Sequence, residues 1–286
     1  MIKLVVSDMD GTLLSKKSGI SDANLKAIQS LKKQHIEFAI ASGRDYQGVY
    51  SIMEEYGIEC EAILGNGAQY VLKDGTLIMS CYMNKEVVKD VAHIFHQRNL
   101  PYMIFTTKGF YTGQKPSFVR EAFIQRSIRR FHASLQDFEH DGKMNNAPCN
   151  QLIQICDWDD FLNQDIDIIK VESFSLTSTE SSTCRQELEN IPTISYLSSF
   201  DDNYEVTDQN AQKGLILEKV IEMKGLNKDE VMVLGDGMND LTLFECFPYS
   251  FAPMNADEKI KELAYRVVRD CEEDGFAEAI QTIKIS

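Results

Sequence analysis

The sequence contains no apolar run that approaches the ~20 uncharged residues needed to cross a bilayer as a helix. Its first residues, MIKLVVSDMDG, are too short an apolar stretch and turn acidic too early for a secretory signal peptide. Both absences argue against an integral membrane protein and against a secreted one. We therefore expect a cytoplasmic protein without a membrane partner.

Positive charge is scarce. Lysine and arginine number 29 against 44 aspartates and glutamates, which gives a formal net charge of −15 at pH 7. Such a chain repels nucleic acids on average, so we expect no nucleic-acid partner. The basic residues Arg126, Arg129 and Arg130 fall on an expected helix, and we interpret them as a solvated face. An anionic substrate would therefore need a local divalent metal or a few placed cations.

Cysteines at metal-binding or redox spacing are also missing. The seven cysteines are odd in number and form no CxxC motif, so neither a zinc site nor a disulfide framework is indicated. Reduced thiols in a cytosolic protein are the expected state. His93 and His96 could share one helical face as metal ligands, but no carboxylate or cysteine stands at ligand spacing. We therefore interpret them as part of a solvent-exposed helix surface.

What the sequence does contain is an alternation of strand and helix signals at both ends. Short apolar runs, each followed by a polar loop, occur at residues 2–6, 36–41, 62–64 and 231–234. Amphipathic helical segments separate them. Strands alternating with helices predict an α/β fold with a doubly wound, Rossmann-like parallel sheet. A chain of 286 residues is long enough for two compact domains.

The middle of the chain breaks this rhythm. Helical and strand patterns follow one another there without regular order: helices at 85–98 and 117–131, strands near 101–106, 151–156 and 193–197. We interpret residues 84–195 as an α+β domain inserted into the α/β core. The core then consists of residues 1–83 and 196–286.

Ligands of an open parallel sheet bind beyond the carboxyl ends of its strands, and the first polar motif stands at such an end. It is Asp8-Met9-Asp10-Gly11-Thr12. Two carboxylates at i and i+2 can serve one reacting phosphate ester: Asp8 would attack phosphorus as the nucleophile, and Asp10 would protonate the leaving oxygen and then deprotonate water. Taken alone, the motif is equally typical of an Asp-Gly turn. A calcium loop is excluded, because Thr12 and Leu13 replace its third carboxylate and its glycine.

Two further motifs are weak by themselves. In Ser42-Gly43-Arg44, after the strand at 36–41, the hydroxyl and a backbone N–H could hold phosphate oxygens, although a Ser-Gly pair is more often only a turn. Lys213 stands at a helix start and could neutralise a transferring phosphoryl group. A single lysine is more often simply solvated.

The fourth motif, Gly235 to Asp240 (GDGMND), follows the strand at 231–234. Its carboxylates and amide suit a hard cation that prefers oxygen ligands, although a surface turn is the alternative. We expect Mg²⁺ to be bound by the side chains of Asp8 and Asp236 and by the backbone carbonyl of Asp10. Asp240 would orient the loop or a metal-bound water, and Asn239 could donate to phosphate.

Together these motifs resemble the haloacid dehalogenase (HAD) superfamily of phosphotransferases, in the Cof-type branch that carries a large α/β cap. The resemblance rests on DMDGTL at 8–13, ASGR at 41–44, NGA at 66–68, Lys213-Gly214, GDGMND at 235–240, Met254-Asn255-Ala256 and EEDG at 272–275. It covers both core segments; in the middle segment it rests on position and size. The chain departs from the pattern at Ala211-Gln212, where relatives often have a small hydroxyl residue.

The resemblance implies a site residue by residue. Asp8 is the implied nucleophile and Asp10 the acid/base, and Asp8, Asp10 and Asp236 are the implied magnesium ligands. The implied phosphate contacts are the backbone of Met9 and Gly43 and the side chains of Ser42, Lys213 and Asn239. We expect four further residues to support this site: Thr12, Arg44, Asn66 and Asp240.

The sequence thus predicts a Mg²⁺-dependent phosphatase that hydrolyses phosphomonoesters of small metabolites, such as sugar phosphates, through an aspartyl phosphate. A phosphomutase of the same superfamily is one alternative, and a non-catalytic regulator that binds a phosphorylated metabolite is another. In this architecture the cap, residues 84–195, is expected to supply substrate specificity. The motifs leave the particular substrate and the oligomeric state open.

Overall fold

The structure, a computed structural model, describes residues 1–15, 19–131, 133–139, 142, 144, 146–175, 182–197 and 203–282, without the side chains of 130, 131, 182 and 183. The chain forms two compact units. The first comprises Met1–Cys81 and Asn210–Ser286, and the second comprises Tyr82–Gln209. No helix in the described ranges is both long and apolar enough to cross a membrane.

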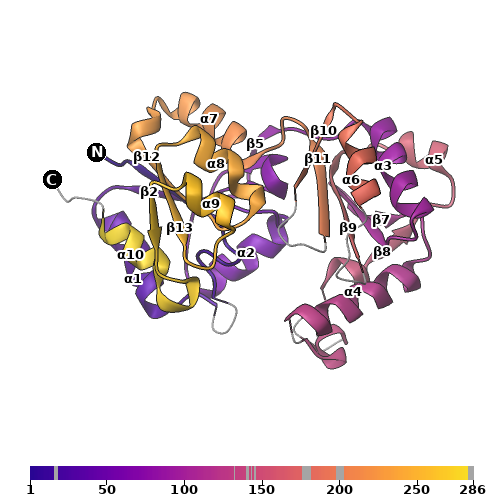
Figure 1. The fold of residues 1–286 in the computed structure, drawn as a ribbon, viewed down its shortest axis with the longest axis horizontal. Helices are drawn as coiled ribbons and strands as arrows, with labels where there is room; N and C mark the ends of the chain where they lie inside the picture. Colours follow the sequence, from indigo (N-terminus) through magenta and orange to yellow (C-terminus); the bar gives the residue numbers. More distant parts are fainter. Residues whose placement is uncertain are drawn as a thin grey trace. The chain divides into compact units, whose positions relative to one another are not determined.

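The first unit is built on an eight-stranded sheet (Figure 1). In spatial order its strands are β14 (Arg266–Val268), β13 (Tyr249–Pro253), β12 (Val231–Leu234), β1 (Leu4–Ser7), β2 (Glu37–Ala41), β3 (Glu61–Leu64), β4 (Gln69–Val71) and β5 (Leu77–Ser80). The pairs from β14 to β3 are parallel, and β4 and β5 continue the sheet as an antiparallel hairpin. The predicted parallel sheet is confirmed.

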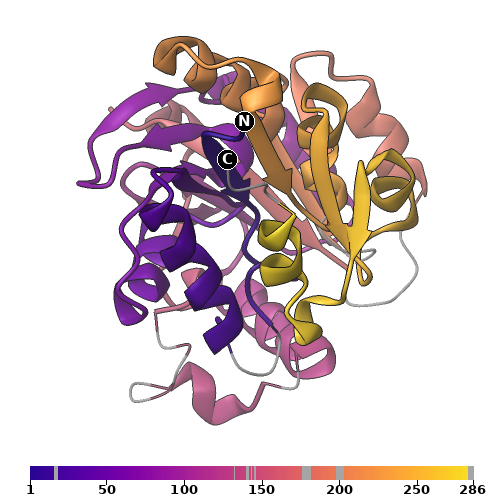
Figure 2. The same cartoon turned by 90° about the vertical axis from the view of Figure 1, so that its left-hand side faces the viewer.

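Helices cover both faces of this sheet, because successive strand residues point to opposite sides and both sides are apolar. Val5 packs with α1 (Asp22–Lys33), α2 (Tyr46–Glu55) and α10 (Gly275–Gln281), whereas Leu4 and Val6 pack with the helices of the other face. Those helices are α7 (Lys213–Lys224), α8 (Leu241–Cys246) and α9 (Glu258–Leu263). Figure 2 shows α1 and α7 on opposite sides of the sheet.

The strand order places β1 at a topological switch point. From β1 the chain runs to β2 and β3 on one side, and it returns later to β12, β13 and β14 on the other side. Ligands of doubly wound sheets bind at the carboxyl ends of strands where the order reverses. For this chain that location is the end of β1, directly before Asp8.

The second unit has a six-stranded sheet with α+β character. Its strands, in spatial order, are β10 (Ile194–Leu197), β11 (Asn203–Asp208), β9 (Ile168–Phe174), β6 (Tyr102–Thr106), β7 (Gly109–Thr112) and β8 (Leu152–Gln154). All neighbouring pairs are antiparallel except β7 with β8. Its helices are α3 (Lys85–Gln97), α4 (Pro116–Phe131), α5 (Trp158–Leu162) and α6 (Ser182–Glu189). Residues of α3, α5 and α6 share one apolar cluster with the sheet.

Two details of the second unit differ from expectation. The strand β11 pairs with β9 over residues 203–206, so the unit extends to Gln209 and residue 195 is not its end. The basic helix face is also not simply solvated. Arg126 is only 5% exposed, and its guanidinium carbon lies 5.3 Å from the ring centroid of Phe174.

Candidate active site

Asp8 is the first residue beyond β1, and the sheet holds its backbone. Its amide N–H donates to the carbonyl of Leu234 at the end of β12, with an N···O distance of 2.9 Å. The residue is only 5% exposed. One carboxylate oxygen, Oδ1, lies 2.6 Å from Nζ of Lys213, which is the first residue of α7. The predicted nucleophile and the predicted lysine, 205 positions apart, are therefore in direct contact.

Lys213 also contacts the GDGMND loop. Its Nζ lies 2.7 Å from Oδ1 of Asp240, and both side chains are fully buried. The other oxygen of Asp240 accepts hydrogen bonds from the backbone N–H groups of Asp236, at 2.9 Å, and Gly237, at 3.0 Å. Asp240 therefore fixes the loop that carries Asp236, which is one of the two roles expected for it.

Asp236 faces the first motif from the other side. The hydroxyl of Thr12 donates to its Oδ1 at 2.8 Å. Gly11, at φ +87°, packs so closely that a β-carbon there would lie 2.4 Å from Oδ2 of Asp236. The backbone N–H of Asp257 donates to the carbonyl of Asp236 at 2.9 Å. The Asp236 side chain is thus held by the loop that begins at Asp8.

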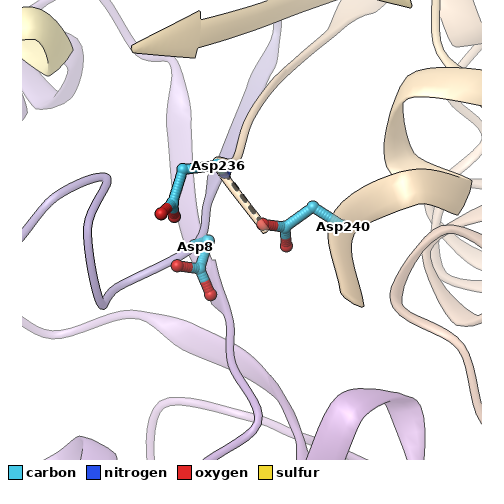
Figure 3. A group of neighbouring side chains, drawn as sticks. All are labelled: Asp8, Asp236 and Asp240. Carbon is cyan, nitrogen blue, oxygen red and sulfur yellow. Dashed lines mark hydrogen bonds between the residues drawn. The ribbon is translucent and has the colours of Figure 1, made fainter. Parts of the chain in front are cut away.

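These contacts gather three carboxylates, Asp8, Asp236 and Asp240, each with one oxygen within 4.8 Å of the others (Figure 3). Burial, followed by the charge of Asp240, raises the pKa of Asp236 to about 7. Burial likewise raises the pKa of Asp8 well above its usual range; Lys213 opposes this rise, and the neighbouring aspartates add to it. Burial alone would lower the pKa of Lys213, but the charges of Asp240 and Asp8 outweigh it and raise this pKa.

The cluster fits a divalent cation. The group contains three acidic side chains and one lysine, so two carboxylate charges lack a compensating cation within it when all three are ionised. Carboxylate oxygens are the ligands that hard cations such as Mg²⁺ prefer, and a bound cation favours the ionised forms that burial disfavours. Asp8 and Asp236 belong to the predicted metal set. The third carboxylate of the group is Asp240, not Asp10.

The Asp10 side chain is not part of this group of three. It is half-exposed, and Arg44 holds both of its oxygens, with Nε at 2.7 Å from Oδ2 and Nη2 at 2.6 Å from Oδ1. Burial alone would lower the pKa of Arg44, but its hydrogen bonds and charge pairing with Asp10 raise it. The expected metal contact of Asp10 uses its backbone carbonyl, so this pairing leaves that prediction standing.

The expected phosphate-binding residues lie around the same strand ends. Ser42 follows β2, is 1% exposed, and its hydroxyl accepts from the N–H of Arg44 at 3.2 Å, with Gly43 between them. Asn239 is 7% exposed and donates to the side chain of Asn66 at 3.2 Å. The Met9 side chain is fully buried in the apolar core, so only its backbone could contact a ligand, and the backbone contact with phosphate stays a prediction.

Asn255, to which the sequence analysis assigned no role, is hydrogen-bonded to the Asp8–Thr12 motif. Its side-chain amide donates to the carbonyl of Gly11 at 2.8 Å, and its carbonyl oxygen accepts from the N–H of Cys271 at 2.9 Å. The only signal was its place in Met254-Asn255-Ala256, one of the segments that carried the resemblance. Asn255 thus connects the loop after β1 with the loop after β14.

A family model described as haloacid dehalogenase-like hydrolase matches residues 5–280. The chain belongs to this family. It is 26% identical to Phosphatase YwpJ of Bacillus subtilis, over 96% of this chain and 98% of that protein. It is 24% identical to the 5-amino-6-(5-phospho-D-ribitylamino)uracil phosphatase YwtE of the same organism, over 96% of each. A solved haloacid dehalogenase-like hydrolase from B. subtilis has a TM-score of 0.84 at 25% identity, and the match covers 99% of this chain and 100% of that one.

Membership confirms the predicted HAD resemblance, and with it the α/β class of the core and the assignment of the chain as a hydrolase of this superfamily. HAD phosphatases generally use a divalent metal, and the chain has a cluster of aspartates able to hold one. The individual roles of the site residues stay predictions.

Proposed function

We propose that this HAD hydrolase is a Mg²⁺-dependent phosphatase that hydrolyses phosphomonoesters of small metabolites through a phospho-aspartate on Asp8. The observation that carries the proposal is the buried contact of Asp8 with Lys213, next to Asp236 and Asp240. A buried carboxylate beside a buried lysine and a cation site is suited to approach a phosphate dianion that it would otherwise repel.

In the first step, an oxygen of Asp8 attacks phosphorus and the bond from phosphorus to the ester oxygen breaks. Asp10 gives a proton to the departing alkoxide, so the alcohol leaves neutral. Lys213 keeps its positive charge beside Asp8 and the incoming phosphoryl oxygens. Ser42, Asn239 and the backbone N–H of Gly43 hold the remaining oxygens of the phosphoryl group.

In the second step, Asp10 takes a proton from water, and the resulting oxygen nucleophile attacks phosphorus. The bond between phosphorus and the Asp8 oxygen breaks, which releases inorganic phosphate and restores the carboxylate. Asp10 returns to its protonated form and is ready for the next ester. To serve both steps it must free one oxygen from Arg44, which holds both in this structure.

Mg²⁺ bound at this site would supply positive charge that offsets the developing charge on the phosphoryl oxygens and keeps Asp8 ionised. The side chains of Asp8 and Asp236 and the backbone carbonyl of Asp10 are the proposed ligands. Asp240 is proposed to act through the loop, because both of its oxygens already bind Lys213 and backbone N–H groups.

We further propose that the second unit selects the leaving group, as a cap. The motifs of the chemistry all lie in the first unit, and none lies within Tyr82–Gln209. The relative YwtE is named for a substrate with a phosphorylated ribityl group, which is a phosphomonoester of a small metabolite. That name supports the substrate class, and we extend only the class to this chain.

The test is a screen of phosphorylated metabolites with Mg²⁺, read as inorganic phosphate and as dephosphorylated product. The proposal requires that inorganic phosphate and dephosphorylated product form in equal amounts. It also requires that EDTA abolishes the activity and that added Mg²⁺ restores it. Asp8→Asn is the control, since the asparagine amide cannot form the acyl phosphate. Its far-UV circular dichroism should match that of the wild type.

Other outcomes identify the alternatives. A rearranged phosphate ester without free phosphate would mean a phosphomutase. Saturable binding of a phosphorylated metabolite without turnover would mean a regulator. Phosphate release that persists in Asp8→Asn would refute the proposed nucleophile.

A further inference from the structure

The turn between β3 and β4, Gly65–Gly67, has an unusual backbone and lies next to the phosphate-binding segments. All three residues have positive φ: 57° at Gly65, 59° at Asn66 and 110° at Gly67. Such angles cost little for glycine, and asparagine tolerates them better than most residues. Asn66 is nevertheless fully buried, so the turn is enclosed by other parts of the first unit.

The backbone of this turn contacts two of the segments that the proposed function uses. The N–H of Asn66 donates to the carbonyl of Ser42 at 3.0 Å, and the N–H of Gly65 donates to that of Arg44 at 2.9 Å. A β-carbon on Gly67 would lie 2.6 Å from the backbone nitrogen of Gln212, which directly precedes Lys213. The turn therefore fits tightly between the Ser42 loop and the start of α7.

The side chain of Asn66 reaches a third segment. Its Oδ1 accepts a hydrogen bond from Nδ2 of Asn239 at 3.2 Å, and both side chains are buried. An amide NH₂ has two donors in one plane. Because one donor of Asn239 is bound to Asn66, rotation of the Asn239 amide is restricted, and with it the range of directions open to its second N–H.

We propose that Asn66 is a positioning residue for phosphate binding. Its side-chain carbonyl holds the Asn239 amide with one N–H directed to a phosphate oxygen, and its backbone holds the Ser42 loop in register with it. This inference rests on the proposed function, since it assigns Asn239 to the phosphate. Asn66 itself need not touch the substrate, and its effect should pass through Asn239.

Two substitutions separate the side chain of Asn66 from its backbone. Asn66→Gly retains access to positive φ and removes the amide, whereas Asn66→Ala removes the amide and also strains the turn. We expect both to weaken inorganic phosphate binding in the presence of Mg²⁺, measured by calorimetry, by about 3- to 10-fold, the value of one hydrogen bond. KM should rise by the same factor, and kcat should change less. Asn66→Ala should in addition melt about 2–4 °C lower than Asn66→Gly.

The double variant Asn66→Gly/Asn239→Ala provides the decisive comparison. If Asn66 acts through Asn239, the double variant should bind phosphate as weakly as Asn239→Ala alone, because no amide remains to be positioned. Multiplicative losses would overturn the inference, as would normal phosphate binding in Asn66→Gly. Wild-type protein that releases no phosphate from any ester would instead reject the proposed function, so the two failures are distinguishable.

Discussion

Nζ of Lys213 lies 2.6 Å from Oδ1 of Asp8, and neither side chain has appreciable contact with solvent. The same ammonium group also pairs with the fully buried Asp240. Burial of these charges is tolerated only because they compensate one another. Loss of one partner from such a group is costly, since it leaves an uncompensated charge away from water.

Lys213→Met should therefore destabilise the metal-free protein by about 3–5 kcal/mol in urea unfolding. Excess Mg²⁺ should restore more stability to this variant than to the wild type, because three carboxylates without a lysine attract a divalent cation more strongly. Lys224→Met is the matched control on the same helix. Lys224 pairs with Glu37 and Glu61 but is partly exposed, so its loss should cost below about 1 kcal/mol. Equal costs for the two variants would contradict the structure.

The raised pKa values of Asp8 and Asp236 predict an unusual pH dependence for the metal-free protein. The pKa of Asp236 is about 7 in the folded state against 3.8 for an ordinary aspartate, so between these pH values the folded protein retains a proton that the unfolded chain has lost. Stability should then fall as pH rises from about 4 to 7, by up to about 4 kcal/mol for Asp236. Asp8 contributes with the same sign. Urea unfolding in EDTA at a series of pH values measures this slope.

Two comparisons isolate the source of that slope. Asp236→Asn cannot titrate, so its stability should vary less over this range. Carboxyl groups with a lowered pKa, such as Glu278, act with the opposite sign, but their contribution is complete above about pH 5, so they do not mask a fall between pH 5 and pH 7. With Mg²⁺ present the fall should diminish or reverse, because the metal binds the ionised carboxylates. Stability that rises between pH 5 and pH 7 in EDTA would show that these aspartates are ionised throughout.

A substitution at Gly11 tests whether the position of the Asp236 carboxylate sets the affinity for Mg²⁺. A β-carbon at Gly11 would lie 2.4 Å from Oδ2 of Asp236, so Gly11→Ala must displace this carboxylate. We expect the Mg²⁺ concentration for half-maximal activity to rise about 10- to 100-fold. Gly57→Ala has comparable backbone strain, at φ +64°, but its β-carbon meets no atom within 4 Å. Gly57→Ala should lose stability without altering the Mg²⁺ requirement. An equal Mg²⁺ concentration for half-maximal activity in the two variants would contradict the proposal that the position of Asp236 sets metal affinity.

The sequence was sufficient to predict which strand ends meet. The apolar runs that become β1, β2 and β12 each stop at a polar motif, and a parallel sheet brings such ends to one edge. That local pattern is enough to bring Asp8 near Asp236. Lys213 was assigned to the site only when the motifs were considered together, because a lysine at a helix start has no distinctive signal alone, and its contact with Asp8 was not predicted.

Pairings between distant polar residues could not be predicted in the same way. Nothing near Asp10 in the sequence indicates that Arg44 will hold it. In the second unit, β9 contains Lys170 and Glu172, which an alternation of apolar and polar residues would place in solvent. Lys170 is instead 5% exposed, at 3.2 Å from Glu205 of β11 and 3.3 Å from Glu172. Its partner on β11 lies 35 positions away in the sequence, so no local pattern shows that the charge of Lys170 can be compensated in the interior. For this reason neither β9 nor β11 was predicted as a strand.

The double role of Asp10 leads to a prediction that depends on the leaving group. Alkyl phosphates need a proton on the departing oxygen, so Asp10→Asn should reduce their turnover about 10²- to 10⁴-fold. p-Nitrophenyl phosphate needs no such proton, because nitrophenolate is a stable anion. Its first step should survive in Asp10→Asn, whereas the second step still lacks the base that activates water. The phospho-enzyme on Asp8 should therefore accumulate.

Rapid mixing of Asp10→Asn with p-nitrophenyl phosphate should then give a burst of nitrophenolate of about one equivalent per active site, followed by slow turnover. Acid quenching and intact-protein mass spectrometry should find one added phosphoryl group, mapped to the peptide that contains Asp8. Asp8→Asn/Asp10→Asn is the control, and it should give neither burst nor phosphoryl group. Steady turnover of Asp10→Asn without a burst would mean that another group activates the water. Complete inactivity towards this ester, with phosphate binding intact, would mean that Asp10 is needed to bind the metal or to place Asp8, not to transfer protons.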